Sequence, residues 1–76
     1  MSLIEEAAKR SRNNRISILN KELNSCYSCL SYIHTEEIKE WTDKEQTPIC
    51  PSCGVDAILP GYYAKPLLRK INKHWF

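Results

Sequence analysis

Four cysteines are the residues of this chain whose type and spacing could do chemistry. They form two pairs, Cys26-x2-Cys29 and Cys50-x2-Cys53, with 20 residues between the pairs. Two such pairs at about this separation are typical of a structural zinc site, because each two-residue turn aims two thiolates at one ion. Gly54 favours a tight turn at the second pair. The spacing predicts one structural Zn²⁺ held by four thiolates, a closed shell with no position for a reactive water.

Other uses of the cysteines fit the sequence less well. Two disulfides need an oxidising compartment, whereas residues 1–10 carry two glutamates and do not resemble a secretion signal. We therefore expect a cytoplasmic protein. A thioredoxin-like redox pair needs a βαβ unit, which this pattern does not offer. An iron centre with four thiolates stays open beside zinc. His34 and His74 are expected at the surface or in packing, because four cysteines already fill the shell.

The length of 76 residues, 42% of them hydrophobic, allows one small domain. A core of this size usually needs a cross-link such as a bound metal ion for a stable fold. No apolar run reaches the 18 residues of a membrane-spanning helix, so no membrane association is expected. We divide the chain into an N-terminal helical arm, residues 1–24, and a zinc-binding domain with a C-terminal amphipathic helix, residues 25–76. The predicted fold class is α+β, a small zinc-ribbon-like domain with two zinc knuckles, a short helix between them and helices at both ends.

Apolar spacing predicts the elements of the N-terminal arm. Ser2 and Glu5 form a capping box, which begins a helix. The apolar face of that helix consists of Leu3, Ile4, Ala7 and Ala8. Two asparagines at 13–14 favour a turn. After it, Ile16, Leu19 and Leu23 recur at helical spacing and predict a second helical stretch, although a strand beginning at Ile16 is the alternative.

The remaining elements are placed around the two knuckles. Residues 30–33 are β-prone and predict a strand. Thr35 begins a short helix that lays Trp41 against the metal core. Segments 47–49 and 55–59 enter and leave the second knuckle and are expected to form a zinc-bearing hairpin. A C-terminal helix begins near Lys65, and its apolar stripe comprises Leu67, Leu68, Ile71 and Trp75.

Charge is segregated along the chain, although the formal net charge is only +2. Residues 1–24 carry +2, residues 25–59 carry −4 and residues 60–76 carry +4. Four thiolates and one Zn²⁺ would add −2, which brings the loaded protein close to neutrality. This distribution does not resemble a uniformly basic nonspecific coat for nucleic acid.

Several short strings beyond the two pairs are also distinctive. They are Glu37-Ile38-Lys39-Glu40-Trp41, Cys50-Pro51-Ser52-Cys53-Gly54-Val55-Asp56 and the terminal Trp75-Phe76. With Cys26-Tyr27-Ser28-Cys29, they resemble a group of small, uncharacterised bacterial cytoplasmic proteins regarded as zinc-binding. The resemblance covers about residues 24–76, and segment 57–64 and the basic arm depart from it. It implies a bacterial or phage cytosolic zinc protein with both knuckles as ligands, and it implies no activity.

The first functional hypothesis is a protein-interaction module, such as a phage or mobile-element inhibitor or regulator of a host protein. The chain offers acidic residues and tyrosines as contacts for a protein partner, and a homodimer that buries the N-terminal helix is a further expectation. The predicted partner-binding residues are Glu36, Glu37, Glu40, Tyr62 and Tyr63. The alternative for the tyrosines is core packing, whereas an ordinary solvated face is the alternative for the basic residues at both ends of the chain.

The second hypothesis is a nucleic-acid-binding zinc-ribbon regulator that uses the basic residues at both ends. Its candidate contacts are Arg10, Arg12, Arg15, Lys65, Arg69, Lys70 and Lys73. The third, an enzyme, is not favoured. The chain has no glycine-rich phosphate loop and no nucleophile elbow, so a nucleophile, a base and oxyanion donors cannot all be assigned.

Overall fold

The computed structural model describes residues 3–76, so the capping box at Ser2 lies outside the described residues. Three α-helices occur in this range: α1 (Leu3–Arg10), α2 (Arg15–Leu19) and α3 (Lys65–Trp75). A single 3-10 turn, η1, covers Thr35–Glu37. The strands are β1 (Leu23–Cys26), β2 (Tyr32–His34), β3 (Trp41–Thr42), β4 (Thr47–Pro48) and β5 (Ile58–Leu59). In residues 3–76 no helix is long and apolar enough to cross a membrane.

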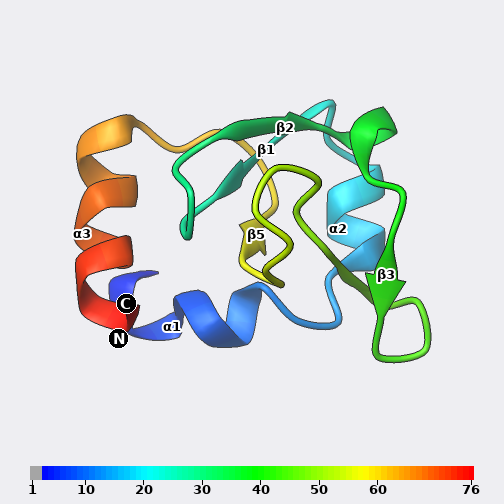
Figure 1. Ribbon diagram of the computed structural model, residues 1–76, viewed down its shortest axis with the longest axis horizontal. Coiled ribbons are helices and arrows are strands. Elements are labelled where there is room, and N and C mark those ends of the chain that lie inside the picture. Colours follow the sequence, from blue (N-terminus) through cyan, green and yellow to red (C-terminus); the bar gives the residue numbers. More distant parts are fainter. Residues whose placement is uncertain (1–2) are drawn as a thin grey trace.

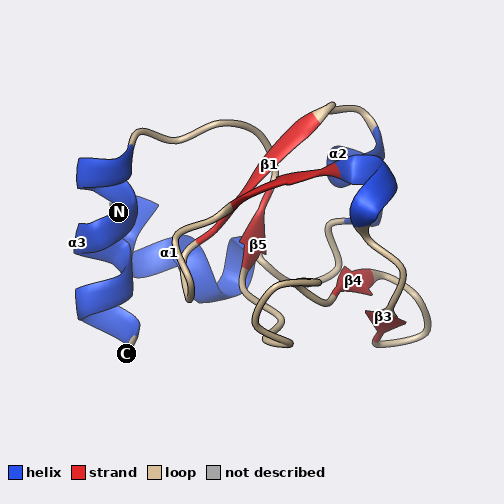
Figure 2. Ribbon diagram, turned by 45° about the horizontal axis from the view of Figure 1, so that its top comes forward, coloured by secondary structure: helices blue, strands red, loops and turns tan. Residues whose placement is uncertain are grey.

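A three-stranded antiparallel sheet, in the order β2-β1-β5, forms the centre of the fold. Ser25 pairs with Tyr32 on one side of β1 and with Leu59 on the other. Strands β3 and β4 form a separate two-stranded hairpin. Helices α1 and α3 lie at one end of the central sheet, and α2 and the small hairpin lie at the other (Figures 1 and 2). The fold is therefore α+β, as expected.

The core joins residues from all parts of the described chain. Its fully buried apolar side chains include Ile18, Ile33, Ile58, Leu59, Leu68 and Ile71. Helix α1 packs against α3, and the indole nitrogen of Trp75 donates a hydrogen bond of 2.6 Å to the carbonyl of Ile4. Asn14 Nδ2 donates to the carbonyl of Ile58 at 3.0 Å. Residues 3–24, assigned from the sequence to an N-terminal arm, are thus packed on the rest of the domain.

The second helical stretch is shorter than predicted. Helix α2 ends at Leu19, and Leu23 begins β1, where it lies opposite His34. Ile16 and Leu19 are exposed, whereas Ile18 is fully buried. The prediction that the helix continues to Leu23 is wrong, and so is the alternative prediction of a strand that begins at Ile16. The physical reason is that Leu23 pairs with a strand 11 residues later, and this non-local pairing outweighs local periodicity.

The helix predicted between the knuckles is reduced to the one turn of η1. Ile38 is already extended, with φ −77° and ψ 114°, and its side chain is buried in the core. Trp41 reaches the core from β3, where it pairs with Pro48. Three successive residues with positive φ, Asp43, Lys44 and Glu45, then reverse the chain into β4. The acidic residues of this segment therefore do not share one helix.

The hairpin predicted around the second knuckle is also wrong, because β4 pairs with β3 and β5 pairs with β1. The predictions of a strand after the first knuckle and of a C-terminal helix are confirmed by β2 and α3. Pro66 stands in the first turn of α3, and Leu68 and Ile71 face the core. Trp75 is 41% exposed, so the buried stripe ends at Ile71.

Candidate metal centre

The first knuckle is the connection between β1 and β2. Cys26 is the last residue of β1, and its backbone N–H donates to the carbonyl of Ser31 at 3.0 Å. Leu30 adopts φ 63°, a left-handed conformation that turns the chain back into β2. Because β1 is the central strand, Cys26 is fully buried, while Cys29 in the turn is half-buried.

The second knuckle lies between β4 and β5. The N–H of Cys50 donates to the carbonyl of Val55 at 3.0 Å, and the N–H of Gly54 donates to the carbonyl of Cys50 at 2.8 Å. Gly54 has φ 75°, a conformation that L-residues rarely adopt, so glycine suits this turn. Cys50 is buried and Cys53 is exposed. Each knuckle therefore offers one deep and one shallower sulfur.

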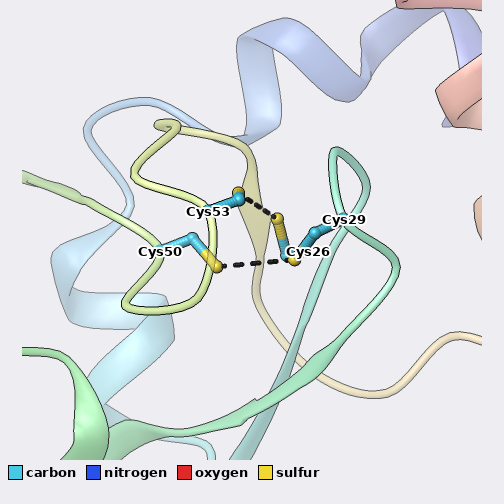
Figure 3. A group of neighbouring side chains, drawn as sticks. All are labelled: Cys26, Cys29, Cys50 and Cys53. Carbon is cyan, nitrogen blue, oxygen red and sulfur yellow. Dashed lines mark hydrogen bonds between the residues drawn. The ribbon is translucent and has the colours of Figure 1, made fainter.

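The four sulfurs converge on one point between the knuckles (Figure 3). The Sγ atoms of Cys26 and Cys53 are 3.7 Å apart, those of Cys29 and Cys50 are 3.8 Å apart, and all four lie within 4.8 Å of one another. A tetrahedral ion with metal–sulfur bonds of ~2.3 Å places its sulfurs ~3.8 Å apart, whereas a disulfide needs ~2.05 Å. The spacing therefore fits one metal ion and not two disulfides, and neither histidine belongs to the cluster.

The environment of the thiols also favours a cation. Burial raises the pKa of Cys26 and of Cys50 above the ordinary range. Burial also acts to raise the pKa of Cys29, but hydrogen bonds with Ser31 and with neighbouring thiols outweigh it and lower that pKa to about 7. Buried thiols lose their protons readily only beside compensating positive charge. A divalent cation in the cluster would supply that charge.

A residue outside the cysteine pairs supports the first knuckle. The side-chain amide of Asn72, on α3, donates hydrogen bonds of 2.9 Å to the carbonyls of Tyr27 and Ser28. Sequence reasoning missed Asn72. The available signal was its position four residues after Leu68, which places a polar side chain close to the buried face of an amphipathic helix.

The predicted partner-binding residues are distributed over several surfaces. Glu36 lines a cavity of about 400 Å³ beside α2, Glu40 lines one of about 310 Å³ beside Cys50, and Tyr63 lines one of about 410 Å³. Glu37 accepts a hydrogen bond from the backbone of His34. Tyr62 is 64% exposed and stacks on Tyr32, with ring centroids 5.0 Å apart.

The predicted nucleic-acid contacts are also separated. Arg10 and Arg12 line the same cavity as Tyr63, together with Lys21, which sequence reasoning missed. Arg15 lies 4.5 Å from the centre of the Trp41 ring and donates to the carbonyl of Glu45. Lys65 lies over the ring of Tyr32 and donates to the carbonyl of Leu30. The remaining three cations are exposed on α3: Arg69, Lys70 and Lys73.

Comparison of the chain with protein-family models, with curated proteins and with solved structures finds no match in any of the three. The zinc-ribbon name and the resemblance to bacterial zinc proteins accordingly stay predictions. What the geometry supports directly is an α+β domain with a four-cysteine cluster able to hold a metal ion.

Proposed function

We propose that this chain is a non-enzymatic protein-interaction module whose fold is held together by one structural zinc ion. The four sulfurs lie at the edge length of a zinc–thiolate tetrahedron, and Zn²⁺ has no geometric preference that opposes this shape. Four thiolates would fill the shell, so the ion would have no open position at which to activate water. Thiolate ligands persist in a reducing compartment, which favours the cytoplasm.

The proposed role of the ion is to cross-link segments that are far apart in the sequence. One knuckle belongs to the central strand β1, and the other precedes β5, which pairs with that same strand. Structural zinc sites contribute about 10–16 kcal/mol, which is comparable with the whole net stability of a domain, about 5–15 kcal/mol. A chain with short strands and no disulfide gains its rigidity from such a cross-link.

The observation that carries the interaction function is the exposure of two aliphatic side chains on α2. Ile16 is 77% exposed and Leu19 is 53% exposed, while Ile18 between them fixes the helix in the core. Leu19 also lines the cavity of about 400 Å³ next to α2. Neighbouring exposed aliphatic residues beside a hollow are typical of protein-binding surfaces, where a partner side chain enters the hollow.

The charge around this site indicates the chemistry of the partner. Glu22 and Glu36 line the same cavity together with Lys21, so carboxylates outnumber ammonium groups in its lining by one. We call Ile16, Leu19, Glu22 and Glu36 the α2 surface. Its proposed occupant is a protein segment with an apolar anchor flanked by basic residues. A small regulator or inhibitor of a bacterial or phage protein is the role that such a surface suits.

The experiment that tests this function compares zinc-loaded variants as bait in nuclease-treated bacterial cytosol. Ile16→Ser/Leu19→Ser should lose a stoichiometric protein that the parent chain retains. Tyr62→Ser tests the tyrosine contact predicted from the sequence, and it should keep the partner because Tyr62 does not belong to the α2 surface. Titration of the purified partner should then show weaker binding to Glu22→Lys/Glu36→Lys, with zinc content unchanged. Equal retention of the partner by the α2 double variant and the parent would refute this placement.

A second copy of the chain is the competing occupant of the α2 surface. Light scattering over a range of concentrations measures the mass of the parent chain and of Ile16→Ser/Leu19→Ser. A parent dimer that becomes a monomer in this double variant would identify the α2 surface as a homodimer interface. A monomer in both leaves the surface free for the protein partner proposed above.

A further inference from the structure

We infer that the cavity between the end of α1, the start of α2 and the Pro60–Tyr63 segment binds single-stranded nucleic acid. This site goes beyond the interaction function proposed above. We call it the basic pocket, and its lining includes Arg10, Arg12, Asn14, Lys21, Pro60 and Tyr63. Its volume of about 410 Å³ falls in the range of small-ligand sites, about 300–1,000 Å³.

The first argument is charge. Three cations, Arg10, Arg12 and Lys21, line the basic pocket, and none of the described residues that line it carries a carboxylate. The ion pair that the structure gives within residues 3–76 joins the half-exposed side chain of Arg10 to Glu6 at 3.8 Å, the outer limit of such a contact. Two guanidinium groups and an ammonium group are thereby available for an anion. One guanidinium group can donate two parallel hydrogen bonds to two oxygens of a phosphate.

The second argument is the aromatic wall. The backbone of Tyr63 is fixed on both sides, because its N–H donates to Ser25 Oγ at 3.1 Å and its carbonyl accepts from Tyr32 Oη at 2.7 Å. Tyr63 thus lines the basic pocket from a fixed backbone, and its ring is the aromatic surface there on which a nucleobase can stack. Bases must be unpaired to stack on a protein side chain, so a single strand fits better than a duplex.

The third argument is the fixed wall of the basic pocket. Asn14 lines the pocket, is only 8% exposed, and donates hydrogen bonds from its amide nitrogen to the carbonyls of Arg10 and Ile58. These two bonds tie the end of α1 to β5, so the wall that carries Arg10 is held in place before a ligand arrives. Cations and an aromatic side chain together favour a nucleotide chain over inorganic phosphate or poly-glutamate, which offer no base to stack on the ring.

The test measures fluorescence anisotropy of a labelled 15-nucleotide single strand of mixed sequence, as DNA and as RNA, with the zinc-loaded chain. Arg10→Gln/Arg12→Gln should weaken binding at least tenfold and reduce the salt slope by about 1–1.5, since each phosphate contact on a single strand contributes ~0.7. Tyr63→Leu should weaken binding about tenfold through lost stacking. Lys21 also lines the cavity beside α2 and is left unchanged.

The matched control is Arg69→Gln/Lys73→Gln, which removes the same charge from α3 and should change affinity less than threefold. Ile16→Ser/Leu19→Ser should bind the strand normally, which separates this site from the proposed protein-binding function. No binding by the parent chain at 150 mM salt would overturn the inference. So would equal losses in the two charge-matched variants, or full displacement of the strand by inorganic phosphate or poly-glutamate at equal charge concentration.

Discussion

Asn72 donates a 2.9 Å hydrogen bond from its side-chain amide to the backbone carbonyl of Ser28, inside the turn between the first two cysteines. The same amide donates to the carbonyl of Tyr27, also at 2.9 Å. Helix α3 is fixed by Leu68 and Ile71, both fully buried. The C-terminal helix is therefore part of the support of the metal site, although it lies more than 40 residues from the first knuckle in the sequence.

Replacement of Asn72 by leucine should weaken both the fold and the metal site. The substitution leaves two carbonyls of the knuckle without their donor, at a cost of about 1–3 kcal/mol in the free energy of unfolding. Zinc affinity should fall by about 10- to 100-fold, and loss of zinc to a competing chelator should be faster, because supporting contacts of this kind orient the ligands. Urea unfolding and stopped-flow chelation measure the two effects.

Asn20→Leu is the control for this change, since it makes the same substitution at an exposed position. It should leave chelation kinetics at the parent value. Parent-like kinetics in Asn72→Leu as well would show that α3 does not support the knuckle.

Removal of the metal should unfold the domain. Cys50→Ser takes away a buried ligand, and metal-free protein loses all of the roughly 10–16 kcal/mol that a structural zinc supplies. Circular dichroism and thermal melting follow the loss of structure, and elemental analysis should find one zinc per chain and no iron. Readdition of Zn²⁺ to chelated parent protein should restore the melting transition. Near-native spectra and melting without metal would contradict a structural role.

The sequence predicts the parts of the fold that are local. The two knuckles are short turns whose geometry depends on neighbouring residues, and Gly54 has the positive φ that its position requires. Helix α3 has 11 residues, enough for periodicity to identify Leu68 and Ile71 as buried. In both cases, the information that determines the structure lies within one segment.

The rest of the fold depends on contacts that no local pattern records. Leu23 was assigned to a helix because its pairing with His34 is not visible in its neighbours. The sequence predicts a polar turn at residues 44–46, but the residue types do not record the left-handed backbone of Asp43, Lys44 and Glu45 that reverses the chain there. Lys21 and Arg12 line one cavity together with Pro60 and Tyr63, which are about 40 residues or more away in the sequence. These placements are products of tertiary structure.

Acid should release the metal. Bound zinc lowers the pKa of the thiols that hold it and keeps them deprotonated. Their contribution to stability is therefore present at neutral pH and is lost when the pH falls through that lowered pKa. The folded environment raises the pKa of Cys26 and of Cys50 by burial, and the thiols of the unfolded, metal-free chain have a pKa of about 8.5, so in both states protons compete with zinc below neutrality. Zinc affinity should therefore fall steeply between pH 7 and pH 5, as measured by competition with a chelator.

The slope of this dependence should change above neutrality. The metal-free chain is expected to unfold, and thiols of an unfolded chain have a pKa of about 8.5, so zinc should displace about four protons below pH 7 and fewer as the pH rises above 8.5. Calorimetry of zinc binding in two buffers of different ionisation enthalpy counts the protons released. A zinc affinity that does not vary with pH would contradict thiolate coordination.

Ser25 links the central strand to the segment that carries the tyrosines, and its loss should destabilise that segment. Its hydroxyl donates to the carbonyl of Gly61 at 2.9 Å and accepts from the N–H of Tyr63 at 3.1 Å, in a position with no solvent exposure. Ser25→Ala leaves both backbone groups unpaired and should cost about 1–3 kcal/mol. For a domain of this size, each kcal/mol lowers the melting temperature by about 4–8 °C.

The effect of Ser25→Ala should be concentrated around Tyr63, because the zinc knuckles keep all of their own backbone hydrogen bonds. Amide hydrogen exchange should accelerate at Tyr63 by about tenfold or more, while the amides of Cys26 and Cys50 stay protected. Ser52→Ala, at an exposed position in the second knuckle, should leave both the melting temperature and this exchange rate unchanged. Equal acceleration at Tyr63 and at the two cysteines would mean that Ser25 stabilises the whole domain and does not position this segment.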